Sequence, residues 1–176
     1  MNQNDIFDRL HRCSETGNVP RLVLDFNGTV CTYRGSADYA TLPMQTYMRN
    51  SLKDGWHRHQ EIIGQVTIFL HNVVKNKIIH PRHIYILSTV SCIAEWEHEI
   101  TMLTNADIVP RCFPAENVIG VGSNEMKIVW MQALMGDGPG NMLPFYIDDD
   151  PTVLRDMQEH GVICFHASEL HALPHQ

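Results

Sequence analysis

Long apolar runs are absent from the 176 residues of this sequence. Their absence argues against a membrane-spanning helix, which needs about 20 predominantly apolar residues in succession. Residues 1–16 are polar and charged, without the basic start and apolar middle of a secretory signal. We therefore expect a cytoplasmic protein with no membrane partner.

Basic residues are in the minority, with 13 Lys and Arg against 20 Asp and Glu and a formal net charge of -7. Nucleic-acid binding normally needs a basic stripe, so we expect no broad nucleic-acid surface. The richest basic stretch, residues 49–59, is typical of a solvated face. The five cysteines lack C-x-x-C spacing, which favours free thiols over a zinc or redox site. The sequence does not indicate an oligomeric state.

The length and the apolar patterning predict one compact α/β domain over residues 1–176. Short apolar runs that end in polar residues predict five buried strands, at 21–25, 83–88, 117–121, 143–148 and 161–166. Apolar residues at helical spacing predict four helices, at 61–75, 92–103, 124–135 and 151–160. This alternation predicts a three-layer sandwich in which helices cover both faces of a central parallel sheet.

Residues 31–59 have weaker periodicity and are interrupted by Gly35, Pro43 and Gly55. We expect this segment to form a flap or a small insertion. In parallel sheets the ligand crevice lies beyond the carboxyl ends of the strands, so residues that follow strands are the candidates for chemistry.

Asp25 follows the first predicted strand and opens the segment Asp-Phe-Asn-Gly-Thr. Gly28 permits a tight turn beside a ligand, and the Thr29 hydroxyl can hold the loop by a hydrogen bond. On its own this segment fits an ordinary turn after a strand equally well.

Three consecutive acidic residues follow the fourth predicted strand: Asp148, Asp149 and Asp150. Their mutual repulsion calls for a cation, and a hard divalent ion held by carboxylates, water and phosphate matches the preference of Mg²⁺. Asp150 precedes Pro151 and is better explained as the cap of the next helix.

Two further polar positions follow strands or open helices. The Ser88 hydroxyl and the amide of Thr89 can hold a phosphoryl oxygen, and the ammonium of Lys127 can reach the acidic crevice. Each residue alone is more typical of a structural position, so their order along the chain carries the interpretation.

That order resembles the four motifs of the haloacid-dehalogenase superfamily: LVLDFNGTV, then IYILS, then Lys127 at the opening of a helix, then FYIDDDP. The resemblance runs from Arg21 to about Leu170 and includes the helix-then-strand ending DMQEHGVICF. Because the first two strands are separated by a short connection, the sequence looks like a member with no large cap domain.

The resemblance implies a Mg²⁺-dependent phosphatase that acts on a phosphorylated substrate. Asp25 would be the nucleophile and would form an aspartyl-phosphate, while Asn27 would occupy the acid/base position and ligate Mg²⁺ through its backbone carbonyl. Ser88 would hydrogen-bond the phosphoryl group, and Lys127 would fix the charges of nucleophile and phosphate. The metal site would be completed by Asp148 with Asp149.

Asn27 departs from that pattern, because phosphatases of this superfamily carry Asp there. An amide cannot exchange a proton at neutral pH, and general acid–base help is worth about 10²- to 10⁴-fold. Three explanations of Asn27 compete. It is natural in a degenerate member of the superfamily, it suits a leaving group that needs no acid, or it was introduced by substitution to trap a complex. His57 and His59 are candidates to replace the missing group.

Two other functions compete with phosphate-ester hydrolysis. A non-catalytic module would keep the fold and bind a partner protein through residues 31–59, and a dehalogenase would act on carbon. The sequence shows no pattern of aromatic or arginine residues for a dehalogenase pocket, so it does not support the dehalogenase alternative. The C-terminal histidines His166, His171 and His175 lack helical i, i+4 spacing, so we do not expect them to form a metal site.

Overall fold

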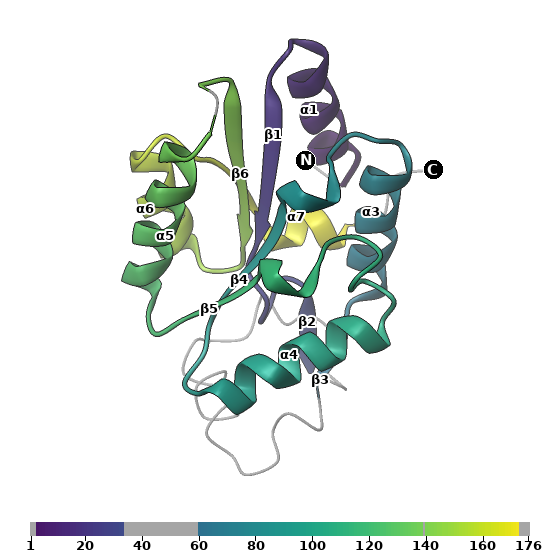
Figure 1. Ribbon diagram of the computed structural model, residues 1–176, viewed down its shortest axis with the longest axis vertical. Coiled ribbons are helices and arrows are strands. Elements are labelled where there is room, and N and C mark those ends of the chain that lie inside the picture. Colours follow the sequence, from purple (N-terminus) through teal and green to yellow (C-terminus); the bar gives the residue numbers. More distant parts are fainter. Residues whose placement is uncertain (1–2, 34–59, 139, 173–176) are drawn as a thin grey trace.

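The computed structural model describes residues 3–33, 60–138 and 140–172. Five strands form one sheet in the order β5-β4-β1-β6-β7, and every pairing is parallel (Figure 1). The strands are β1 (Val19–Leu24), β4 (Ile84–Thr89), β5 (Val118–Val121), β6 (Met142–Asp148) and β7 (Ile163–His166). The predicted α/β class with a central parallel sheet is confirmed.

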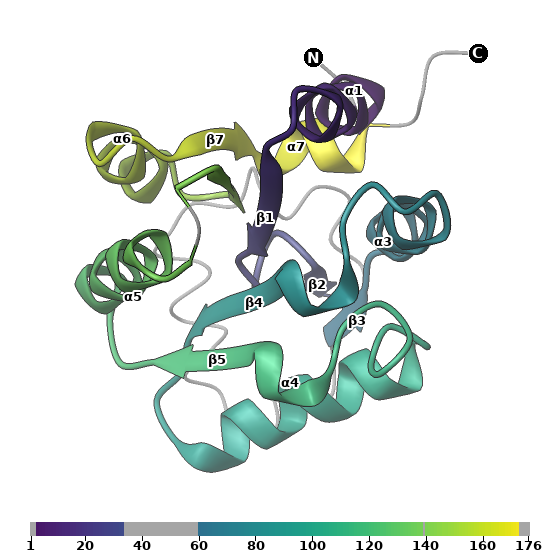
Figure 2. The same ribbon diagram turned by 45° about the horizontal axis from the view of Figure 1, so that its top comes forward.

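Helices cover both faces of this sheet, as Figure 2 shows. One face packs against α1 (Gln3–Glu15), α3 (Gly64–Lys75), α4 (Ile93–Asn105) and α7 (Ala167–His171), and the other against α5 (Asn124–Gly136) and α6 (Pro151–Glu159). Successive residues of a strand point to opposite faces. Accordingly, Leu22 and Leu24 of β1 lie in the core with α1 and α3, while Val23 lies in the core with α5 and α6.

The strand order makes β1 the central strand. The chain adds β4 and β5 on one side of β1 and then returns to add β6 and β7 on the other side. A crevice forms at such a reversal, beyond the carboxyl ends of the two strands that flank it. The residues that follow β1 and end β6 therefore meet at the expected ligand position.

The predicted helix at 61–75 is wrong at its start. Gln60–Ile62 forms strand β3, Ile63 is extended with φ -73° and ψ 116°, and the helix begins only at Gly64. Two β-branched isoleucines in succession suit a strand as well as a helix face, and pairing with another strand decides between them. The helices α1 and α7 were not predicted.

That other strand is β2 (Cys31–Tyr33), which pairs antiparallel with β3. In this strand pair Tyr33 is opposite Gln60. The flap was predicted at 31–59, and its first three residues form β2. The rest of it, residues 34–59 with the basic stretch, His57 and His59, lies outside the described residues.

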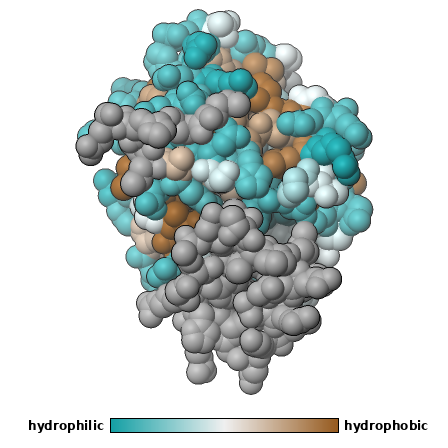
Figure 3. Space-filling view, turned by 180° about the vertical axis from the view of Figure 1, so that it is seen from behind, coloured by the Kyte–Doolittle hydropathy of each residue, from teal (hydrophilic) through white to brown (hydrophobic). Residues whose placement is uncertain are grey.

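The described part of the chain contains no helix long and apolar enough to cross a membrane. On the side opposite to Figure 1, the coloured surface is mainly hydrophilic and apolar side chains show in a few separate areas (Figure 3).

Candidate active site

Three carboxylates converge beyond the carboxyl ends of the two central strands. Asp25 directly follows β1, Asp148 is the last residue of β6, and Asp149 comes next. One oxygen from each lies within 4.8 Å of the others. The pairing of Leu24 with Ile147 explains this proximity, because it leaves Asp25 level with Asp148 on neighbouring strands.

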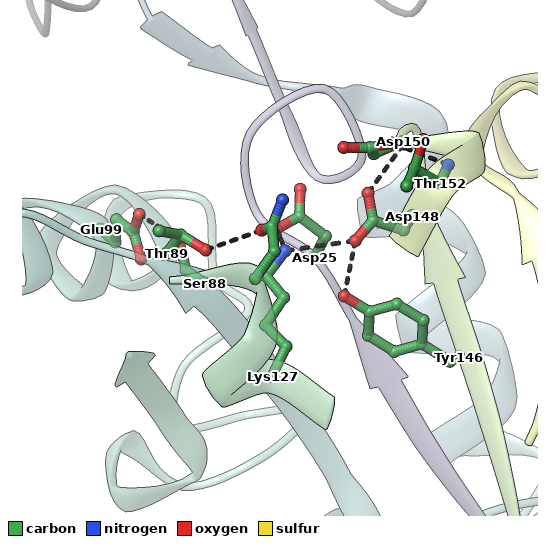
Figure 4. Close-up of polar contacts among 10 residues, drawn as sticks. Asp25, Ser88, Thr89, Glu99, Lys127, Tyr146, Asp148, Asp150 and Thr152 are labelled. Carbon is green, nitrogen blue, oxygen red and sulfur yellow. Dashed lines mark hydrogen bonds and ion pairs between the residues drawn. The ribbon is translucent and has the colours of Figure 1, made fainter. Parts of the chain in front are cut away.

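Lys127 lies between two of these carboxylates (Figure 4). It is in the first turns of α5, and its Nζ is 2.6 Å from Asp25 Oδ1 and 3.2 Å from Asp148 Oδ2. The three side chains are at most 8% exposed. The lysine is thus a buried cation shared by two buried anions, and its ammonium donates a hydrogen bond to each.

Asp148 is held by two further donors. The Tyr146 hydroxyl donates to its Oδ2 at 2.5 Å, and the Asp150 amide donates to its Oδ1 at 2.9 Å. Tyr146 was missed by the sequence analysis, although it lies two residues before Asp148 and so points to the same face of β6. The prediction that Asp150 caps the next helix is confirmed, since its side chain accepts from the Thr152 amide at the start of α6.

The loop after β1 carries Asn27 and Gly28. The Asn27 side-chain oxygen accepts a hydrogen bond of 2.7 Å from Gln60 of β3, whose own oxygen accepts from His98 of α4 at 3.1 Å. Gly28 has φ +81°, and a Cβ there would collide with the Asp149 carboxylate. This loop therefore requires glycine for both its backbone conformation and its closeness to the acidic cluster.

Two C-terminal histidines contact the backbone of the site loops. His166 Nε2 donates to the Asp149 carbonyl at 3.1 Å, and His171 Nε2 donates to the Thr29 carbonyl at 2.7 Å. The prediction that the Thr29 hydroxyl holds the loop is wrong: Thr29 is fully buried, and its Oγ1 has no hydrogen-bond partner among the described residues. His175 lies outside the described residues.

Ser88 and Thr89 end β4, on the side of Asp25 away from Asp148 (Figure 4). The Ser88 hydroxyl donates to Glu99 Oε1 of α4 at 2.7 Å, and the Thr89 hydroxyl donates to Asn124 of α5 at 3.1 Å. Glu99 was not predicted from the sequence, although it falls in the apolar stripe of its helix with Trp96, Ile100 and Leu103. A charged residue in such a stripe is a usable signal.

The three carboxylates of the cluster have only Lys127 as a positively charged partner among the described residues, and their pKa values reflect this. Burial raises the pKa of Asp25 to about 7, against the lowering effect of Lys127. Burial, followed by the charges of Asp25 and Asp148, raises the pKa of Asp149 to about 8. Burial disfavours the charged form of Lys127, but the two carboxylates beside it dominate and its pKa is raised.

This donor set fits a hard divalent cation. The cluster contains three carboxylates, and Lys127 pairs with two of them, so the ionised cluster retains a net negative charge. Carboxylate oxygens are the ligands that Mg²⁺ prefers. A bound cation would also oppose the effects of burial and of neighbouring carboxylates, which raise the pKa values of Asp25 and Asp149. Asp25, Asp148 and Asp149 are the side chains that would hold it.

Comparisons with known proteins find similarity among solved structures. No family model matches this chain, and no curated protein does. The solved HAD domain of effector protein Lem4 from Legionella pneumophila is similar, with a TM-score of 0.46 and 16% identity over 85% of this chain and 86% of that one.

Proposed function

We propose that this protein is a Mg²⁺-dependent phosphohydrolase of the haloacid-dehalogenase type that acts through an aspartyl-phosphate on Asp25. The observation that carries the proposal is the buried bridge from Lys127 to Asp25 and Asp148, inside a cluster of three carboxylates. Together with the ordered sequence motifs, this arrangement supplies a nucleophile, a cation and metal ligands at one point of the fold.

In this mechanism an Asp25 oxygen attacks the phosphorus of the substrate, and the bond from phosphorus to the leaving oxygen breaks. Water then attacks the phosphoryl group on Asp25, releasing phosphate and restoring the carboxylate. Lys127 favours the ionised form of Asp25 and faces the charge of the transferring group. Mg²⁺, when bound, supplies further neutralisation of the phosphoryl oxygens.

Asn27 makes the proton transfers of this cycle slow. Its amide has no proton to exchange at neutral pH, and Gln60 fixes its oxygen as a hydrogen-bond acceptor. The leaving oxygen must then take its proton from water. We therefore expect slow turnover, with the fastest reaction for esters whose leaving groups need no acid.

A panel of phosphate esters assayed with and without Mg²⁺ tests the proposal. Asn27→Asp should raise turnover about 10²- to 10⁴-fold. Asp25→Ala should abolish it, while Asp8→Asn, an exposed acidic position on α1, should leave it unchanged. Reduction with borohydride followed by peptide mass analysis should locate the phosphoryl group on Asp25.

If neither the original chain nor Asn27→Asp exceeds Asp25→Ala on any ester, the phosphohydrolase assignment is wrong. Binding of a partner protein that survives Asp25→Ala would then favour the non-catalytic module.

A further inference from the structure

Glu99 is a buried carboxyl group that the proposed reaction leaves without a role. Glu99 is 2% exposed. Its Oε1 accepts a hydrogen bond from the hydroxyl of Ser88, which is fully buried. Oε2 is also buried and has no hydrogen-bond partner within the described part of the chain. An ionised carboxylate held in this way by one neutral donor is costly, because its lost hydration is only partly replaced.

Packing alone does not require a carboxyl group here. Glu99 lies among apolar neighbours of α4, where a leucine of similar volume would fill the same space without the desolvation cost. The carboxyl group instead reaches past the helix to the end of β4, beside the phosphoryl position of the proposed site (Figure 4). Its position points to an effect on Ser88.

The charged and titratable groups around Glu99 come from four elements. Glu95 lies one turn earlier on α4, Asp25 follows β1, Lys127 comes from α5, and the Cys31 thiol belongs to β2. Burial raises the pKa of Glu99 well above its usual value; the Ser88 hydrogen bond and Lys127 lower it, while Asp25 and Glu95 raise it. A neutral carboxylic acid is thus the favoured form.

The form of Glu99 decides what Ser88 can do, because a hydroxyl has a single hydrogen to donate. If Glu99 is ionised, it accepts that hydrogen and adds negative charge behind the phosphoryl position. If Glu99 carries its proton on Oε1, that O–H donates to Ser88 Oγ across the same 2.7 Å contact, and the Ser88 hydrogen is free for a phosphoryl oxygen.

We propose that Glu99 is a positioning residue whose proton directs the Ser88 hydroxyl toward the phosphoryl group. The proposal rests on the proposed function, since it assumes that a phosphoryl group occupies the site. Phosphate binding should therefore need protonated Glu99, and it should weaken as Glu99 ionises.

The test compares the full chain with Glu99→Gln and Glu99→Leu. Glutamine is isosteric, remains neutral at every pH and can always donate to Ser88 Oγ. Leucine fills the space without accepting the Ser88 hydrogen. Glu99→Leu therefore replaces Glu99→Gln in the test if glutamine impairs folding. Glu97→Gln, with the same loss of charge at an exposed position of the same helix, is the matched control.

The first measurement is infrared spectroscopy of the unliganded protein as the pH is raised. We expect the carbonyl band of a protonated buried carboxyl group, lost in Glu99→Gln and kept in Glu97→Gln. This measurement needs neither substrate nor turnover, so it is independent of the phosphohydrolase proposal. If the original chain and Glu99→Gln show the same carbonyl absorption at neutral pH, the inference is overturned, even if the enzyme proves active.

The second measurement is the affinity for inorganic phosphate in the presence of Mg²⁺, from about pH 5 to about pH 9. The ratio of the Glu99→Gln affinity to that of the original chain should be near one at low pH. It should rise about 10- to 100-fold as Glu99 ionises, the worth of a hydrogen bond to a charged group.

A ratio that does not change with pH would mean that Glu99 has only a structural role, and the inference would fail. Failure of every variant and of the original chain to bind phosphate would instead remove the proposed function, and with it the premise of a phosphoryl group beside Ser88. The Glu97→Gln ratio should stay at one throughout.

Discussion

Replacing Lys127 by methionine removes the only cation that described residues place within the carboxylate cluster. Methionine keeps the length and most of the volume of the lysine stem, so the packing of α5 against the sheet is largely conserved. What is lost is a buried ammonium 2.6 Å from Asp25 and 3.2 Å from Asp148. Both carboxylates then remain buried without their charge partner.

Breaking a buried ion pair in this way costs about 3–5 kcal/mol in the free energy of unfolding. Protonation limits that loss, since the pKa of Asp25 is already about 7 and rises further when the lysine is gone. Near neutral pH the variant should fold with Asp25 protonated. At higher pH each unit should remove about a further 1.4 kcal/mol until Asp25 ionises in the folded state. In the original chain, the raised pKa of Lys127 keeps the ammonium charged over this whole range.

Urea unfolding of both proteins at several pH values, without Mg²⁺ and then with it, measures these effects. Lys75→Met, at an exposed position in the last turn of α3, is the matched control and should change stability by less than about 0.5 kcal/mol. Mg²⁺ should restore much of the stability lost in Lys127→Met, because it returns positive charge to the same oxygens. A loss below about 1 kcal/mol at every pH would refute the shared-cation description.

Three further predictions concern the same site. Without Mg²⁺, the free energy of unfolding of the original chain should fall as the pH rises from about 4 to about 8, because the folded pKa values of Asp25 (about 7) and Asp149 (about 8) exceed their usual 3.8. Bound Mg²⁺ should make this fall smaller. Urea unfolding at several pH values measures it, and a free energy of unfolding that does not change with pH would contradict the prediction. Gly28→Ala should cost about 1–2 kcal/mol and weaken Mg²⁺ binding measured by calorimetry, because its Cβ displaces the Asp149 carboxylate. Gly161→Ala has a similar φ of +83° with open space around it, so equal Mg²⁺ affinities in the two variants would argue against the displacement. Tyr146→Phe should lower the free energy of unfolding by about 1.5–3 kcal/mol, the worth of a hydrogen bond to a charged group, with Tyr85→Phe as the control in the same core.

The layers and the site's backbone positions could be predicted from the sequence. Buried parallel strands read as short apolar runs, and the polar residue at the end of each run is visible without any tertiary information. Asp25, Ser88 and Asp148 were located in this way. The prediction was wrong at Glu61 to Ile63, because these residues suit a strand as well as a helix. Pairing with strand β2 decides that they are extended.

The amino-acid sequence by itself thus determined which side chains stand at the carboxyl edge of the sheet, because alternation and strand ends are local properties of the chain. Only the tertiary structure decided their partners. Lys127 meets Asp25 across 102 residues, Gln60 meets Asn27 across 33, and Glu99 meets Ser88 from a separate helix. Such contacts depend on how each helix packs and turns against the sheet, and no short stretch of sequence encodes that geometry.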